Sequence, residues 1–141
     1  MAKGASISGF PEWLPSERVV EQRVIDTLRK VFELNGFIGI ETRAVETGAS
    51  LLKKGETSKE IYLLSRLQEV GHESDTPIEE RLGLHFDLTV PLSRYVVEHS
   101  GALAFPFKRW QIQKVWRGER PQEGRFREFV QADIDVIGAG D

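Results

Sequence analysis

The sequence has 141 residues, and none of them is cysteine. This absence excludes disulfide bonds, thiolate metal ligands and a cysteine nucleophile, and it fits a reducing compartment. No apolar run approaches the length that spans a membrane, and the opening residues MAKGAS lack the apolar core of a secretory signal. We therefore expect a soluble, cytoplasmic protein with no membrane partner.

Several common enzyme motifs are also missing. Neither G-x-S-x-G nor G-x-G-x-x-G occurs, and the stretch GASLLKKGETSK lacks the residue order of a phosphate-binding loop. His72, His85 and His99 are not spaced like metal ligands, so the sequence predicts no metal-binding residue. His72 falls in a polar loop. We expect His85 to pack against its neighbours, with a supporting role beside Asp87 as the alternative.

The remaining composition is that of a globular protein. Hydrophobic residues make up 40% and charged residues 29%, which at this length predicts one domain with a single core. The net charge is −3, yet residues 108–127 contain seven bases and only two acids. This local excess suggests an anionic ligand, although a charge cluster more often marks a solvated surface. The bases are Lys108, Arg109, Lys114, Arg117, Arg120, Arg125 and Arg127.

The spacing of apolar residues predicts an α+β fold, with an antiparallel sheet flanked by helices. One helix should run from about residue 17 to 34, with Ser16 as its N-cap and an apolar stripe packed on the core. A second should run from Pro91 to about His99. We expect loops at residues 43–59, with one helical turn near 50–53, and at 66–81. We expect strands at residues 37–42, 60–65, 82–89, 106–117 and 127–136.

Two of the expected strands alternate clearly between apolar and polar residues. In 82–89 and in the returning strand of the last hairpin, the even-numbered residues are apolar and should face the core. If both strands belong to one sheet, their polar faces would form a floor for a ligand beneath the arginine-rich hairpin. A solvated sheet face is the alternative reading. The odd-numbered polar residues are Asp87, Thr89, Gln131, Asp133 and Asp135.

The stretch WRGERPQEGRFREFVQADIDVIG resembles motif 2 of class II aminoacyl-tRNA synthetases, and in detail it is similar to the histidyl-tRNA synthetase family. ISGFPEWLPSE resembles that family's lead-in, the first helix with GFIGIETRAVE resembles motif 1, and LHFDLTVP resembles the first segment of its amino-acid pocket. The resemblance covers nearly the whole chain. It places motif 1 at about 17–46, the pocket segment at 84–91 and motif 2 at about 107–138.

The resemblance implies a class II catalytic core. Such an enzyme, a histidine–tRNA ligase, joins histidine to ATP as histidyl-adenylate and transfers the histidyl group to tRNA(His). It further implies ATP with Mg²⁺, for which no ligand can be assigned, and a homodimer. A histidine-sensing regulatory subunit of ATP phosphoribosyltransferase is the alternative, although Arg117, Glu119 and Arg125 argue against it. A stand-alone RNA-binding hairpin is a third possibility.

On the ATP side, the resemblance assigns four residues of motif 2. Arg117 would bridge the carboxylate of histidine and the α-phosphate of ATP, which are two anions that must meet. Arg125 would hold the outer phosphates of a bent ATP. Glu119 would accept a hydrogen bond from the adenine amino group, and Phe129 would stack on the base.

On the amino-acid side, the resemblance assigns Asp87, Thr89 and Gln131 to the α-ammonium group of histidine, with Gln131 also near the carboxylate. Asp135 would accept an imidazole N–H, and such a pocket rejects side chains that lack the donor. We assign no role to Asp133 beyond a structural pairing with a nearby base.

The hairpin loop and the limits of the resemblance leave some points open. Arg120 and Gln122 either reach the acceptor end of tRNA or form an exposed tip. Arg43-Ala44 stand where motif 1 commonly has a proline, which leaves the detail of the dimer open. The chain ends at Asp141, directly after motif 2, without motif 3 or an anticodon-binding domain. We therefore expect a fragment of a longer synthetase that does not activate histidine alone.

Overall fold

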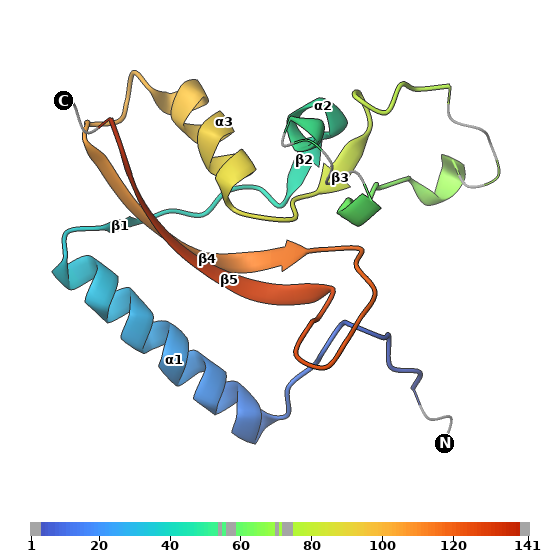
Figure 1. Ribbon diagram of the computed structural model, residues 1–141, viewed down its shortest axis with the longest axis horizontal. Helices are drawn as coiled ribbons and strands as arrows, with labels where there is room; N and C mark the ends of the chain where they lie inside the picture. The colour runs from blue at the N-terminus through green and yellow to red at the C-terminus, as the bar shows by residue number, and fades with distance from the viewer. Residues whose placement is uncertain (1–3, 54, 56–58, 70, 72–74, 139–141) are drawn as a thin grey trace.

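The computed structural model describes residues 4–53, 55, 59–69, 71 and 75–138. A long twisted hairpin crosses the molecule, with the longest helix on one side and the two shorter helices and a second, small sheet on the other (Figure 1). His72 lies outside the described residues. No helix in the described part of the chain is long and apolar enough to cross a membrane.

The hairpin consists of β4 (Phe107–Trp116) and β5 (Glu128–Ile137). The two strands pair antiparallel over their whole length, which confirms the predicted hairpin. A two-residue strand, β1 (Ile38–Gly39), joins the other edge of β4 in parallel orientation. The sheet order is therefore β1-β4-β5, and the sheet is mixed rather than purely antiparallel.

The smaller elements differ most from the sequence-based expectations. The expected loop at 43–59 contains β2 (Val45–Thr47) and the short helix α2 (Gly48–Leu52). The side chain of Thr47 caps α2 by accepting a hydrogen bond from the Ser50 N–H at 3.3 Å. Gly48 is required there, because an added Cβ would lie 1.9 Å from the Ile78 carbonyl oxygen.

The other two expected strands are shortened. Residues 60–65 contribute only an isolated bridge between Leu63 and Gly83, and the strand at 82–89 is reduced to β3 (Leu82–Leu84). β3 pairs with β2 in a separate two-stranded antiparallel sheet. A single turn of 3-10 helix, η2 (Leu67–Glu69), is the regular structure described within the expected loop at 66–81.

The first helix, α1 (Pro15–Leu34), begins slightly before the expected start. Its N-cap is Leu14 rather than Ser16, since Pro15 fits the first helical position and needs no hydrogen-bond donor there. The carboxylate of Glu17 accepts the Leu14 N–H at 3.0 Å. The expected packing of its apolar stripe on the core is wrong, because no described residue of α1 is buried.

The core lies on the other side of the hairpin, where the buried residues come from β4, α2, α3 (Thr89–His99, as predicted) and the segment after β3 (Figure 1). This side receives the odd-numbered face of β4. On the even-numbered face Trp110, Ile112 and Trp116 are only half-buried, and Ile112 lies toward α1. The buried apolar residues are Leu51, Phe86, Leu88, Leu92, Phe107 and Val115.

The expectation that even-numbered residues form the core is therefore wrong in β5 and only partly right in the segment 82–89, where Phe86 and Leu88 are buried. In β5, Ile134 and Val136 are 46% and 49% exposed, because no described element covers that part of the edge strand. In the segment 82–89, Leu82 is exposed, whereas His85 and Asp87 are buried with their apolar neighbours. The chain leaves the strand conformation after β3, so the two-residue period no longer separates its faces.

Candidate functional site

Arg117 lies directly after β4 and connects three parts of the chain. Its Nε donates to the Phe86 carbonyl oxygen at 3.0 Å, and its guanidinium lies 5.1 Å from the centre of the Phe129 ring. Its backbone N–H donates to the Arg127 carbonyl oxygen at 2.8 Å. The guanidinium is therefore held between β5 and residues 84–91, the expected first segment of the amino-acid pocket. Its acceptor in that segment is an uncharged carbonyl group.

The segment around Asp87 reaches this site by crossing the end of β4 rather than by sharing its sheet. The expectation of one sheet for residues 82–89 and β5 is wrong, since β3 pairs with β2. Asp87 is buried, and its Oδ1 accepts the Val90 N–H at 3.1 Å at the start of α3. Thr89, the first residue of α3, is exposed.

His85 holds this crossing together, which confirms the expectation that it packs against its neighbours. Its buried ring stacks on Trp116 with centroids 5.6 Å apart, and Nε2 donates to the Lys114 carbonyl oxygen at 2.6 Å. The backbone N–H of Trp116 in turn donates to the His85 carbonyl oxygen at 3.1 Å. Burial lowers the pKa of His85, so the ring is neutral at neutral pH.

The polar face of β5 carries the other expected histidine-binding residues. The Gln131 Nε2 donates to both carboxylate oxygens of Asp133, at 3.2 and 2.9 Å. The Gln131 Oε1 is buried and has no hydrogen-bond partner among the described residues. Asp135 forms an ion pair with Arg109, with Oδ2 and Nη2 2.7 Å apart.

The expected pairing of Asp133 with a base needs correction. Its carboxylate is bonded by the amide of Gln131, whereas Arg109 donates from Nη1 to its backbone carbonyl oxygen at 3.2 Å. Arg109 is close to Asp133, but it forms its ion pair with the carboxylate of Asp135.

Sequence reasoning missed three residues of this face, namely Arg109, Gln111 and Gln113 on β4. In the strand register they lie opposite Asp135, Asp133 and Gln131 respectively. β4 has the same alternation as β5, but its apolar residues Trp110 and Ile112 suggested that only the even-numbered face was of interest. The signal that could have revealed the three residues is that odd-numbered residues of β4 pair with the odd-numbered polar residues of β5.

Gln111 and Gln113 bind the β1–β2 connection through Thr42. The Gln111 Nε2 donates to the Thr42 Oγ1 at 2.9 Å and to the Gln113 Oε1 at 2.7 Å. The Gln113 Nε2 donates to the Thr42 carbonyl oxygen at 2.7 Å. The Gln111 Oε1 is buried without a hydrogen-bond partner among the described residues, like the Gln131 Oε1. Unused buried acceptors of this kind are costly in a plain core and favour a polar ligand nearby.

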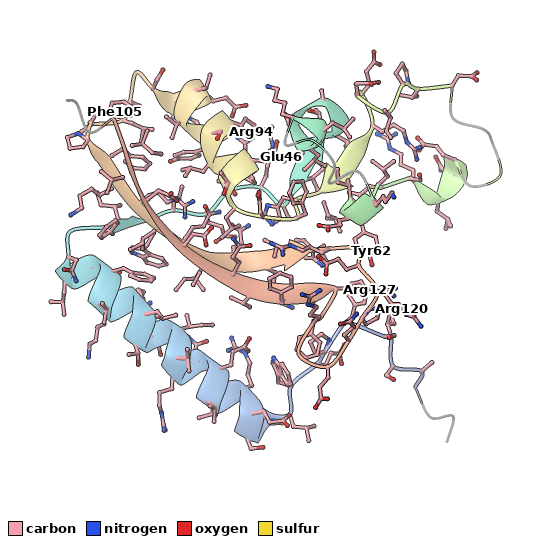
Figure 2. The ribbon with its side chains drawn as sticks, viewed as in Figure 1. Glu46, Tyr62, Arg94, Phe105, Arg120 and Arg127 are labelled. Carbon is pink, nitrogen blue, oxygen red and sulfur yellow. The ribbon has the colours of Figure 1, made fainter. Side chains whose placement is uncertain are left out.

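The hairpin loop is a tight, exposed turn. Gln122 and Arg125 exchange backbone hydrogen bonds of 3.2 and 2.9 Å, and both side chains are exposed. Arg127 closes the base of the loop by donating from Nε to the Glu119 carbonyl oxygen at 2.9 Å. Figure 2 shows the side chains of Arg120 and Arg127 at this end of the hairpin.

The basic cluster predicted from the sequence is only partly a surface patch. Lys108 and Lys114 have partners in the Asn35 carbonyl oxygen and the Glu128 carboxylate, at 2.6 and 2.8 Å, and Arg109 is buried. The hydrogen bond from Lys114, together with one from Trp116, lowers the pKa of Glu128. Arg120 and Arg125 remain exposed at the tip, beside the half-buried Arg117 and Arg127.

The described residues do not form a metal site. No group of three or more histidine, aspartate or glutamate side chains comes together in the described ranges. No residue of these ranges is assigned to the Mg²⁺ that the family resemblance implies.

The fold and the polar face together define the class of protein. A mixed sheet whose long hairpin carries an arginine at the end of one strand, flanked by helices, is the partial core of a class II aminoacyl-tRNA synthetase. A solved histidyl-tRNA synthetase from Nostoc sp. PCC 7120 superimposes with a TM-score of 0.80 at 44% identity, covering 99% of this chain and 30% of that one. A Bacillus halodurans structure described as an ATP phosphoribosyltransferase regulatory subunit/histidyl-tRNA synthetase gives 0.78 at 22% identity, covering 97% and 33%, and supports the fold alone.

The sequence comparison identifies the family within this class. The histidine–tRNA ligase of Bifidobacterium animalis subsp. lactis is 93% identical over 99% of this chain, which spans 30% of that relative's length. No family model matches the chain. The chain belongs to the histidine–tRNA ligase family, as a segment of about 30% of the length of the curated relatives it matches.

Proposed function

We propose that this chain supplies motif 1, the first amino-acid pocket segment and motif 2 of a cytoplasmic histidine–tRNA ligase, at about residues 17–46, 84–91 and 107–138. The observation that carries the proposal is the position of Arg117, which connects the segment beside Asp87 to Phe129. The 93% identity to the Bifidobacterium histidine–tRNA ligase supports the same activity.

The proposed reaction brings two anions together. A carboxylate oxygen of histidine attacks the α-phosphorus of ATP, the bond to the bridging oxygen breaks, and pyrophosphate leaves with histidyl-adenylate as the other product. Arg117 would offset the charge on the reacting phosphoryl group, and Arg125 the charge on the outer phosphates. Glu119 would accept from the adenine amino group, with Phe129 as the aromatic surface of the base site.

The polar face would bind the amino acid. The buried Gln131 Oε1, which lacks a partner among the described residues, suits the α-ammonium group of histidine. Asp87 and Thr89 would complete this subsite from the start of α3, where the hydrogen bond from Val90 orients the Asp87 carboxylate. Asp135 would accept the imidazole N–H.

The remaining partners of the ligase follow from exposed surfaces. The loop residues Arg120 and Gln122, which are exposed, would approach the acceptor end of tRNA(His). Val20, Val24 and Val31 form an exposed apolar face on α1, which supports the homodimer implied by motif 1.

The proposal is tested in a full-length ligase carrying this segment, made by exchanging it for the matching segment of the Bifidobacterium relative. We expect histidine-dependent ATP–pyrophosphate exchange, followed by histidyl-tRNA formation. Arg117→Ala should lower the exchange rate by about 10³-fold or more, because it removes charge stabilisation from the transition state.

The control for this substitution is Arg120→Ala, which removes an equally basic side chain from the exposed loop. It should leave pyrophosphate exchange near the unsubstituted rate. Arg117→Ala should cost only about 1 kcal/mol of stability, the value of one hydrogen bond, as measured by urea unfolding. Undiminished exchange in Arg117→Ala, or exchange that does not require histidine, would refute the proposed function.

A further inference from the structure

Arg109 is the largest fully buried side chain in the described part of the chain, with 0% of its surface exposed. A guanidinium stays charged in proteins, and an uncompensated buried charge costs several kcal/mol. Here Nη2 lies 2.7 Å from the Asp135 Oδ2, and Nη1 donates to the Asp133 carbonyl oxygen at 3.2 Å. The position of this cation is thus set by β5.

Asp135 is much less buried than its partner, with 46% of its side chain exposed. Its Oδ2 faces Arg109, while Oδ1 has no hydrogen bond or ion pair with any described residue. The carboxylate can therefore accept a hydrogen bond from a ligand without giving up the buried pair. Arg109 restrains the carboxylate and offsets its charge.

The charged groups of the neighbouring elements come from β5 and α3. Asp133 of β5 adds a second negative charge that acts on Arg109, although both of its oxygens are bonded by Gln131. The helix α3, on the same side of the sheet, carries Arg94 and Glu98, which pair with each other, and His99, whose ring contacts Tyr95. In β1, the residue in register with Arg109 is the uncharged Ile38.

We propose that Arg109 is a positioning residue that makes Asp135 select the neutral imidazole of histidine over imidazolium and other cationic side chains. The inference rests on the proposed function, because it assigns the ligand of Asp135. With Arg109 present, Asp135 is one half of a neutral ion pair and favours a neutral N–H donor. Without Arg109, the carboxylates of Asp133 and Asp135 have no buried cation beside them and favour a cationic ligand.

The test is the pH dependence of KM for histidine in pyrophosphate exchange, in the full-length ligase carrying this segment. An imidazole with a pKa of about 6.5 is mostly neutral at pH 7.5 and mostly protonated at pH 5.5. We expect KM to be about tenfold higher at pH 5.5 than at pH 7.5, in proportion to the lost neutral fraction. Arg109→Met, a neutral substitution, should reduce this ratio to less than about threefold, since the cation is now accepted.

Arg109→Lys is the matched control, because it keeps the charge and should retain the tenfold ratio. Asp135→Asn should raise KM at pH 7.5 more than it lowers kcat, since an amide is a weaker acceptor. If Arg109→Met keeps the tenfold ratio of KM between pH 5.5 and pH 7.5, even while it lowers stability, the proposal is overturned and Arg109 is a purely structural residue. Loss of the ratio in Arg109→Lys would also overturn it.

A second measurement applies even if Arg109→Met fails to fold. Calorimetric titration of histidine into the unsubstituted ligase at pH 6.0, in two buffers of different ionisation enthalpy, counts the protons released on binding. Selection of the neutral form requires release of about 0.8 proton per histidine bound. Binding without proton release would refute the inference and leave the proposed function intact, whereas absence of histidine binding would refute the proposed function itself.

Discussion

His85 is buried at the point where the segment after β3 crosses β4, and its ionisation is coupled to folding. Burial lowers the pKa of its imidazole, against the opposing effects of the hydrogen bond to Lys114 and the charges of Glu46 and Asp87. The Lys114 carbonyl oxygen accepts from Nε2 both in the neutral Nε2–H tautomer and in the protonated ring, so this hydrogen bond does not exclude the proton. Burial is the effect that disfavours the protonated ring in the folded state.

At the residue scale, we predict that this histidine weakens the protein in acid. In the unfolded chain the ring takes up a proton below about pH 6.5, whereas the folded chain does so only at lower pH. The free energy of unfolding should fall as pH drops below 6.5, by up to about 1.4 kcal/mol per pH unit from this group. Urea unfolding at several pH values between 7 and 5 measures this decrease in the free energy of unfolding.

His85→Gln is the informative variant for this prediction, because glutamine can still donate to the Lys114 carbonyl oxygen but does not titrate. It should flatten the pH dependence of the free energy of unfolding. Identical pH dependence in His85→Gln and the unsubstituted protein would show that burial of this ring is not coupled to its protonation.

At the element scale, β2 and α3 are joined by a buried ion pair. The Glu46 carboxylate is fully buried and lies 2.7 Å from the Arg94 Nε, and Figure 2 labels both side chains between the two elements. Burial disfavours the charge on Arg94, but hydrogen bonds with Glu46 and Glu98 raise its pKa. Since α3 begins beside Asp87 and Thr89, this pair also positions the proposed ammonium subsite.

We predict that breaking this pair is strongly destabilising. Arg94→Met should cost about 3–5 kcal/mol in urea unfolding, because it deprives the buried Glu46 carboxylate of its main counter-charge. Glu98→Gln, which breaks the more exposed ion pair of the same arginine, should cost less than about 1 kcal/mol. Equal losses for the two variants would mean that Arg43, 3.5 Å from the Glu46 carboxylate, already compensates it.

At the scale of the whole molecule, the two sides of the hairpin are unequally covered. The side with the odd-numbered residues is packed, whereas the side toward α1 leaves Val20 and Val24 of the helix more than half exposed, with Ile134 and Val136 nearly so. The expected site is also open to water, since Asp135 is nearly half exposed. Charge stabilisation is weak where water has access.

We therefore predict that the isolated chain of 141 residues does not catalyse histidine-dependent pyrophosphate exchange, although the full-length ligase carrying the same segment does. The chain spans 30% of the length of its Bifidobacterium relative. The same exchange assay on equal molar amounts of the two proteins provides the comparison. Exchange by the isolated chain at the rate of the ligase would show that this segment holds a complete site.

The sequence by itself determined the elements with long, regular patterns. The apolar spacing of α1 and α3 and the alternation along β4 and β5 require only local chemistry, so helices and hairpin were predicted within a few residues. Short elements were predicted poorly: β2 was missed, and α2 was expected only as one helical turn near 50–53. The start of α2 depends on close packing against Ile78, which lies 30 residues beyond Gly48.

Only the tertiary structure decided which face of each strand is buried. Alternation separates two faces but does not say which one other elements will cover, and here the polar face of β4 lies inward, with Arg109 and Gln111 fully buried. The residues of the proposed site were visible as residue types in β5 and around Asp87. The partners of these residues were not visible in the sequence. The register of the hairpin brings Arg109 to Asp135, and a chain crossing brings Phe86 to Arg117; local sequence patterns encode neither.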